Sequence, residues 1–316
     1  MSDQTNILHL YRRLGFGVSP KQWHRLRAQT LRQAVDQLFK SEAKPFEAPK
    51  YARPSKRTFQ SMDKTKRKEV QRELRRGVAT LNQRWIQHMA SDESSPLLEK
   101  MTLFWHGHFA CSHKRVDFAA EQLEVLRTHA LGNFRDLLVA ISKDAAMILY
   151  LNNQQNRKNK PNENFARDLM ELFTLGRGHY TEQDVKEAAR AFTGWITNRF
   201  TGVFQWTDKQ HDTGSKTFKS RTGRWKGEDI IDFILEEEQT ARFLVRKIYR
   251  YFVNEKETDD VLIERLAQEF YRSNYDIGKL MRGIAESQWF YEQKHQGAKV
   301  KSPVEWLVGT AKVLQV

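Results

Sequence analysis

Apolar residues recur at helical spacing through most of this 316-residue chain. One stretch shows the pattern clearly: it contains Val70, Leu74, Val78, Leu81, Trp85 and Met89. Residues three or four positions apart lie on one face of an α-helix, so each such stretch can bury a stripe against its neighbours. Prolines and glycines separate the stretches, as they do between helices. The sequence therefore predicts a mainly α fold, a multi-helix globular bundle.

The helical pattern is interrupted between residues 197 and 227. This segment contains four glycines and alternates apolar with polar residues at Val203, Gln205 and Thr207. Such alternation is typical of a short strand, and glycine favours turns. We expect a long loop with a short β-hairpin at 197–227, after which helices resume at Glu228. A second irregular segment contains Pro45, Pro49 and Pro54, and it predicts a linker over residues 42–58.

The composition excludes several classes of protein. The longest apolar run, Ala145–Leu151, has seven residues, whereas a membrane-spanning helix needs about 20. Residues Met1–Leu10 lack the basic and apolar regions of a secretion signal, so we expect a cytoplasmic protein. A single cysteine, Cys111, excludes an internal disulfide framework and a cysteine-rich zinc site. The sequence also lacks the His-Glu-x-x-His and Gly-x-Ser-x-Gly motifs of known hydrolase classes.

Positive charge is concentrated in two segments. The formal net charge is +14, and Lys50–Arg76 holds 11 Lys or Arg residues against 3 Asp or Glu residues. Arg199–Lys226 holds 7 against 2, interleaved with Trp206, Phe218 and Trp225. Concentrated cations attract polyanions, and aromatic side chains can stack on bases. Both segments are therefore candidate surfaces for an anionic polymer, although solvated helix faces and a hairpin core would give the same composition.

Histidines gather in the aromatic segment Phe104–Phe109, which contains His106 and His108, and His113 follows. Imidazole binds metal ions and transfers protons near neutral pH. Two residues on a helix correspond to about 200° of rotation, so His106 and His108 diverge unless Gly107 breaks the helix. Two interpretations follow for His106 and His108. They are either a pair of metal ligands or two hydrogen-bonded histidines of the core.

Two further clusters carry charged side chains. Glu163, Arg167 and Glu171 lie within about 80° of one another on an α-helix, where they could form either a salt-bridge ladder or a pair of carboxylates at a cleft. His211 and Asp212 lie in the basic loop. They could face a site or simply form a turn.

Several motifs, in order along the chain, together resemble one bacterial family. They are His9–Gly17, Met101–Phe109, Asn162–Gly176, Tyr180–Val185, Ala191–Trp195, His211–Lys216 and Lys301–Glu305. These motifs resemble those of the family called domain of unknown function 1800, from about residue 9 to residue 314.

The resemblance implies a mostly helical protein and supplies no reaction, cofactor or catalytic residue. It favours a single family domain over residues 1–316. Family members usually continue past the Lys-Ser-Pro-Val-Glu segment into a Pro-Asn-x-x-Gly-Trp motif, so we expect this chain to be truncated at its C-terminal end. Many members look secreted.

Two hypotheses of function follow. The first is a hydrolase-type enzyme whose site combines His106, His108, Glu163, Arg167, Glu171, His211 and Asp212. A divalent metal, held by His106, His108, Glu163 and Glu171, is a possible cofactor, since a metal ion lowers the pKa of bound water. The alternative is a non-catalytic basic helical module that binds nucleic acid or another anionic polymer through Lys50–Arg76 and Arg199–Lys226.

Overall fold

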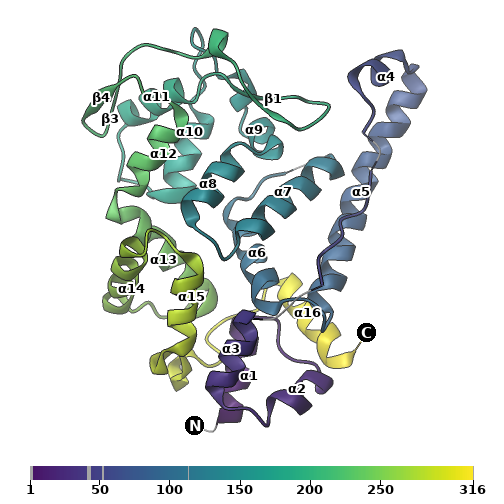
Figure 1. The fold of residues 1–316 in the computed structure, drawn as a ribbon, viewed down its shortest axis with the longest axis vertical. Coiled ribbons are helices and arrows are strands. Elements are labelled where there is room, and N and C mark those ends of the chain that lie inside the picture. The colour runs from purple at the N-terminus through teal and green to yellow at the C-terminus, as the bar shows by residue number, and fades with distance from the viewer. Residues whose placement is uncertain (1–2, 41–43, 52, 113, 316) are drawn as a thin grey trace.

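Helices make up most of the computed structural model, which describes residues 3–40, 44–51, 53–112 and 114–315 (Figure 1). Within these residues the chain forms sixteen α-helices and two small antiparallel hairpins, which confirms the prediction of a mainly α fold. No helix in this described part is both long and apolar enough to cross a lipid bilayer.

The helices follow one another in this order: α1 (Asp3–Arg13), α2 (Pro20–Leu26), α3 (Leu31–Lys40), α4 (Lys56–Ser61), α5 (Lys64–Ala90), α6 (Pro96–His108), α7 (Val116–His129), α8 (Phe134–Ser142), α9 (Ala145–Tyr150), α10 (Asn164–Asp168), α11 (Glu182–Ala191), α12 (Gly227–Leu235), α13 (Glu238–Phe252), α14 (Asp260–Arg272), α15 (Ile277–Glu286) and α16 (Pro303–Leu314).

The irregular segment predicted at 197–227 contains most of the strand residues. β1 (Trp195–Thr197) pairs with β2 (Phe204–Trp206), and β3 (Lys216–Phe218) pairs with β4 (Arg221–Gly223). Lys219 and Ser220 connect β3 to β4 with φ angles of 48° and 65°. Left-handed backbone at both central residues suits a tight hairpin turn, because its twist matches that of the strands. The predicted hairpin is confirmed, and the structure adds a second one.

The helices begin at capping side chains rather than at the first residue of an apolar run. Thr181 forms a capping box with Asp184 at the start of α11, and Ser95 caps α6. Residues 134–151 form two helices, because Asp144 accepts a hydrogen bond from the Met147 amide and starts α9 as a separate helix after α8. A capping carboxylate in the middle of an apolar run thus breaks the run into two helices.

A long basic arm projects from the body of the molecule. Asp63 caps α5, whose 27 residues span about 40 Å at 1.5 Å per residue. Figure 1 shows α5 rising along one side of the molecule with α4 at its far end. Its lower part packs against α7 and α16, and the Tyr51 hydroxyl donates to the carbonyl of Gly77. The proline-rich segment therefore runs along α5, although residues 42, 43 and 52 of the predicted linker lie outside the described part.

Helix α6 lies at the centre of the bundle and buries two consecutive charges. The Glu99 carboxylate is fully buried and accepts hydrogen bonds from Arg127 at 2.7 Å and from the Trp85 indole at 2.8 Å. His88 lies 3.3 Å from the same carboxylate. Since these partners come from α5 and α7, Glu99 ties the base of the arm to the core.

The neighbouring charge, Lys100, connects α6 to the C-terminal helix. It is 3% exposed and its Nζ donates to the carboxylate of Glu305 in the first turn of α16. Ser302 and Glu305 form a capping box there, which fixes the carboxylate in place. A buried ion pair of this kind sets the position of α16 more than it adds net stability.

We predict that replacement of one partner of the Glu99–Arg127 pair strongly lowers the free energy of unfolding. Glu99→Leu leaves the Arg127 guanidinium buried without its carboxylate, and the free energy of unfolding should fall by about 3–5 kcal/mol. Urea denaturation measures this loss. Glu99→Leu/Arg127→Leu should lose less than the single variant, and Glu124→Leu on the exposed face of α7 should change little. A Glu99→Leu protein as stable as the parent would contradict the assigned role.

Candidate functional site

The two histidines of α6 point to different surroundings. His106 is exposed and its ring lies 5.5 Å from the ring of Trp85. His108 is buried, its Nε2 donates to the carbonyl of Phe173 at 3.1 Å, and its Nδ1 accepts from Lys247 at 3.3 Å. Burial lowers the pKa of His108 to about 3, so the imidazole is neutral. The expected divergence of the two side chains is what the structure shows, while His113 lies outside the described residues.

His108 and Lys247 meet the end of an unusual helix. After α10 the chain continues as a π-helix, Leu169–Thr174, whose last carbonyls lack partners within the helix. Lys247 donates to the carbonyl of Leu172 at 2.8 Å, next to the bond from His108 to Phe173. A hollow of about 410 Å³ opens beside these two side chains. The pair thus caps a helix terminus and also lines a cavity.

The carboxylates around Arg167 divide into two separate groups. Arg167 pairs with Glu163 at 3.0 Å, as an i,i+4 neighbour should, and with Glu182 at 2.7 Å. Glu171 instead bonds Arg177 at 2.6 Å and the Tyr180 hydroxyl at 2.7 Å. The expected ladder assumed an α-helix, but the wider turns of the π-helix rotate Glu171 away from Arg167.

His211 and Asp212 bind the loop to the body of the protein. The His211 Nδ1 donates to the carbonyl of Thr193 at 2.9 Å, and Arg190 donates to Asp212 at 2.7 Å. Burial acts to raise the pKa of Asp212, but the hydrogen bonds from Arg190 and the Gly214 amide, together with the nearby positive charges, outweigh it and the pKa is lowered. Lys216 Nζ donates to the carbonyl of Asp212 at 2.5 Å. These bonds close the loop on α11.

The predicted site residues therefore form pairs rather than one centre. His108, Glu163, Glu171 and His211 each have their own partners on different elements. Among the residues that the structure describes, no group of three or more His, Cys, Asp or Glu side chains could hold a metal ion. The expected ligand set of His106, His108, Glu163 and Glu171 does not gather.

The single cysteine, Cys111, is half-buried just before α7. Its thiol donates to the Gln122 amide oxygen at 3.1 Å, and burial raises its pKa to about 11. A reactive cysteine needs the thiolate form near neutral pH. Cys111 thus has the properties of a core residue.

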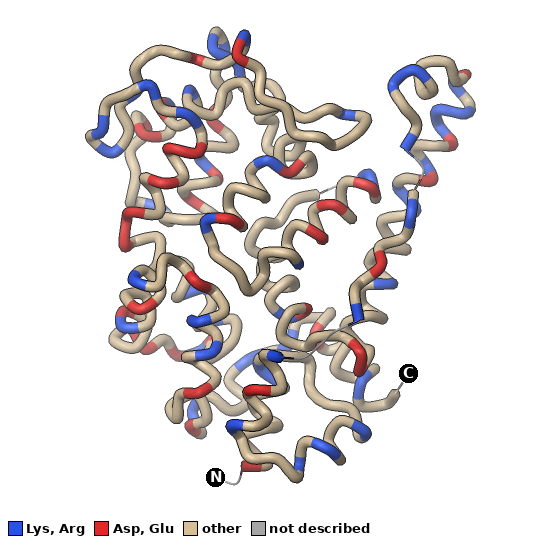
Figure 2. The backbone as a smooth tube through the Cα atoms, in the orientation of Figure 1, with Lys and Arg blue, Asp and Glu red and all other residues tan. Residues whose placement is uncertain are grey.

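Basic residues recur along α5, as the blue positions on its backbone in Figure 2 show, and some of them form a stripe on its exposed face. At 100° per residue the stripe occupies an arc of about 120°, opposite the buried face that carries Leu74 and Leu81. Its members are all exposed, and within the described residues none of them forms an ion pair. They are Lys64, Lys68, Arg72, Arg75 and Arg76.

The second basic segment meets the arm at one point. The rings of Phe59 and Phe200 lie 6.1 Å apart, and Arg53 donates to the carbonyl of Thr201 at 2.7 Å. Exposed Arg199 lies in the same turn. The two segments are thus neighbours at the β1–β2 connection.

Farther along the chain, basic side chains of the second segment form ion pairs or are buried within the fold. Lys219 pairs with Glu237 and Arg221 with Glu236, while Lys216 is 1% exposed. Of the aromatic side chains, Phe218 is buried and Trp225 packs edge-on against Phe233. The stretch from Lys216 to Lys226 is mostly a packed hairpin, so the basic surface is concentrated on α4, α5 and the turn at Arg199.

The sequence pattern does not single out two basic residues that the structure places at cavities, Lys100 and Lys247. Lys100 and Lys247 lie in helices that read as ordinary amphipathic segments, where a lysine is normally solvated. For Lys100 a signal exists: it is preceded by Glu99 and surrounded by Leu97, Leu98 and Met101. A charged pair within an apolar helix indicates burial with partners.

The family model described as "Protein of unknown function (DUF1800)" matches residues 9–316. No curated protein matches the chain, and no solved structure matches it either.

We predict that Asp212 is needed for the closure of the loop. Asp212→Ala removes the acceptor for Arg190 and should cost about 1–3 kcal/mol of unfolding free energy. The same change should accelerate trypsin cleavage within 197–227. Asp208→Ala, an exposed change in the same loop, is the matched control and should leave both measurements near the parent values. Equal cleavage rates for the two variants would contradict this role.

Proposed function

Because this chain belongs to the DUF1800 family, whose description names no reaction, we propose its function from its own geometry: it binds nucleic acid through the basic arm formed by α4 and α5. The observation that carries the proposal is the stripe of exposed cations on α5, which form no ion pair with any residue that the structure describes.

The dimensions of the stripe suit a phosphate backbone. From Lys64 to Arg76 the helix rises about 18 Å at 1.5 Å per residue. Double-stranded DNA carries one charge per about 1.7 Å of its axis, so several phosphates face a stripe of this length. The long flexible side chains of lysine and arginine can adjust to the irregular spacing of these phosphates.

The cations of the arm are available to a ligand. A surface ion pair would have to break before a phosphate could bind, but these side chains have no such partner among the described residues. Binding then releases the counterions that surround the polyanion, which favours association at low salt. Contacts to phosphate carry no sequence information, so the binding is sequence-independent.

We predict a salt-dependent affinity for a 20-base-pair DNA duplex. Lys64→Gln/Lys68→Gln/Arg72→Gln should weaken binding and lower the slope of log K against log salt concentration by about 3, because each lost phosphate contact lowers it by about 0.9. Fluorescence anisotropy at several salt concentrations measures both quantities.

The matched control removes the same charge elsewhere. Lys21, Arg265 and Arg272 are exposed on α2 and α14 and form no ion pair among the described residues. Lys21→Gln/Arg265→Gln/Arg272→Gln should change the slope far less than the variant on α5. Equal losses would mean that net charge alone drives binding, and absence of binding at low salt would contradict the proposal outright.

A hydrolase-type enzyme is the second candidate, and one observation favours it. His108, the predicted site residue that lines a cavity, receives a hydrogen bond from Lys247 beside the hollow of about 410 Å³. Burial lowers the pKa of Lys247 to about 8, so a fraction of its amine is neutral at slightly alkaline pH. A neutral amine can accept a proton from an attacking water molecule or hydroxyl.

We predict for this candidate that hydrolysis of p-nitrophenyl acetate rises with pH around a midpoint near 8. The sign follows from the pKa, because the neutral amine exists above it. Lys247→Gln should abolish the rise, whereas Arg250→Gln in the same hollow should retain it. Repetition with EDTA tests the metal dependence expected from the sequence. Identical rates in the parent and Lys247→Gln would exclude Lys247 as the base.

A further inference from the structure

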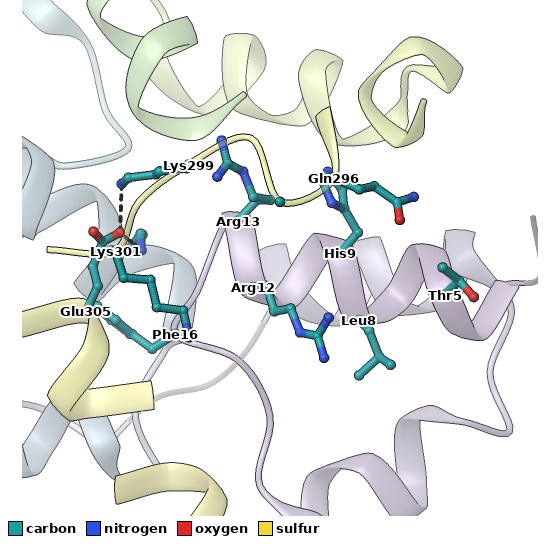
Figure 3. A pocket seen from close by; sticks show the side chains of 12 residues that line it. Thr5, Leu8, His9, Arg12, Arg13, Phe16, Gln296, Lys299, Lys301 and Glu305 are labelled. Carbon is teal, nitrogen blue, oxygen red and sulfur yellow. Dashed lines mark hydrogen bonds and ion pairs between the residues drawn. The ribbon is translucent and has the colours of Figure 1, made fainter. Parts of the chain in front are cut away.

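A second hollow, which shares the lining residue Lys299 with the hollow beside His108, lies between α1 and α16. Its volume is about 230 Å³, and its walls come from α1 and the residues after it, from Lys100 of α6, from the segment between α15 and α16, and from the first turn of α16. Figure 3 shows His9 and Arg13 pointing from α1 toward the segment that carries Gln296 and Lys299. Sites for drug-sized ligands measure about 300–1,000 Å³, so this hollow suits a smaller molecule.

Cations dominate the walls of this hollow. Five of them line it, namely Arg12, Arg13, Lys100, Lys299 and Lys301, and Glu305 is the carboxylate among the lining residues. The Glu305 carboxylate is shared by Lys100 and by Lys299, which lies 2.8 Å away. The next carboxylate, Glu255, accepts a bond from the Val300 amide. Even with both carboxylates counted, cations exceed them by three.

The cations differ in how firmly they are held. Arg13 is buried, and its guanidinium donates to the carbonyls of Phe252 at 2.8 Å and Val253 at 2.5 Å. Lys100 is fixed by Glu305 and lies 4.8 Å from the ring centre of Phe16. The carbonyl oxygens orient the charge of Arg13 without neutralising it, whereas Lys100 shares the single Glu305 carboxylate with Lys299. The positive charge of the wall is therefore preorganised.

Two cations at the rim are available to a ligand. Arg12 and Lys301 are exposed, and within the described residues neither forms an ion pair. Arginine and lysine in this position can close on an anion, since a guanidinium offers a planar pair of donors to phosphate oxygens.

A buried acceptor completes the wall. His9 is 6% exposed, its Nδ1 donates to the carbonyl of Phe290, and its Nε2 has no hydrogen-bond partner among the described residues. Burial lowers the pKa of His9 to about 4, so Nε2 carries a lone pair at neutral pH. A hydroxyl group beside the anionic group of a ligand would satisfy this nitrogen, because unpaired buried polar atoms are costly.

We propose that this hollow binds a small phosphate monoester that carries a hydroxyl group. The phosphate dianion matches the excess of cations, and the hydroxyl matches His9. The site is separate from the arm, to which the nucleic-acid proposal assigns α4 and α5.

Isothermal titration calorimetry with sn-glycerol 3-phosphate, inorganic phosphate and malonate tests the proposal at low ionic strength. We expect saturable binding of glycerol phosphate, weaker binding of inorganic phosphate and the weakest binding of malonate. Arg12→Gln/Lys301→Gln should weaken the binding of glycerol phosphate at least tenfold, whereas Lys21→Gln should leave it unchanged. Both replaced side chains are exposed, so the variant should keep the parent melting temperature without ligand.

Several results would overturn the proposal. One is the absence of saturable binding of any of the three anions, and another is malonate binding as tight as that of glycerol phosphate. A third is equal affinity of the parent and Arg12→Gln/Lys301→Gln. The variant on α5 separates the two proposals: it should bind glycerol phosphate like the parent while its affinity for DNA falls, and joint loss of both activities would contradict a separate site.

Discussion

Two adjacent charges on α6, buried and directed to different partners, hold the arrangement of this protein together. Glu99 binds Arg127 and Trp85, while Lys100 binds Glu305. Consecutive residues on a helix are about 100° apart, so one helix can bind two sets of neighbours. An unpaired charge at this depth would be strongly unfavourable, and alternative packings of α5, α7 and α16 against α6 would leave one. The pairs thus specify which helices meet.

Local signals in the sequence account for most of the fold. Apolar spacing predicts the helices, and side chains of types that favour helix starts, such as Ser95 and Thr181, cap them in the structure. The sequence did not reveal the π-helix at Leu169–Thr174, because an apolar pattern over six residues fits several helix types. It also did not reveal Lys100 as a buried residue. Its partner Glu305 lies 205 positions away, and pairings of such separation depend on tertiary packing.

In the candidate site, too, the sequence predicts contacts between residues close together in the chain but not contacts between distant segments. The pairing of Arg167 with Glu163 follows from a spacing of four residues, and it is present. The supposed convergence of His106, His108 and His211 required three segments to meet, and each histidine instead contacts its own neighbours. Residue type indicated which side chains are capable of catalysis or metal binding, but only the tertiary arrangement determines which of them share a cavity.

The distribution of charge separates two kinds of basic residue. Arg13 of α1 and Lys100 of α6 are buried and are oriented by carbonyls, a ring or a carboxylate. Lys64 and Arg72 are solvated on one exposed helix face. A fixed cluster in a small hollow discriminates between anions by shape, whereas a solvated stripe responds to charge density and is screened by salt. The stripe adds little to the free-energy cost of folding, because its side chains stay solvated. In the hollow, by contrast, five cations surround one cavity and repel one another, which lowers the stability of the folded protein. That repulsion is relieved when an anion enters, so anion binding at the hollow should also stabilise the junction between α1 and α16.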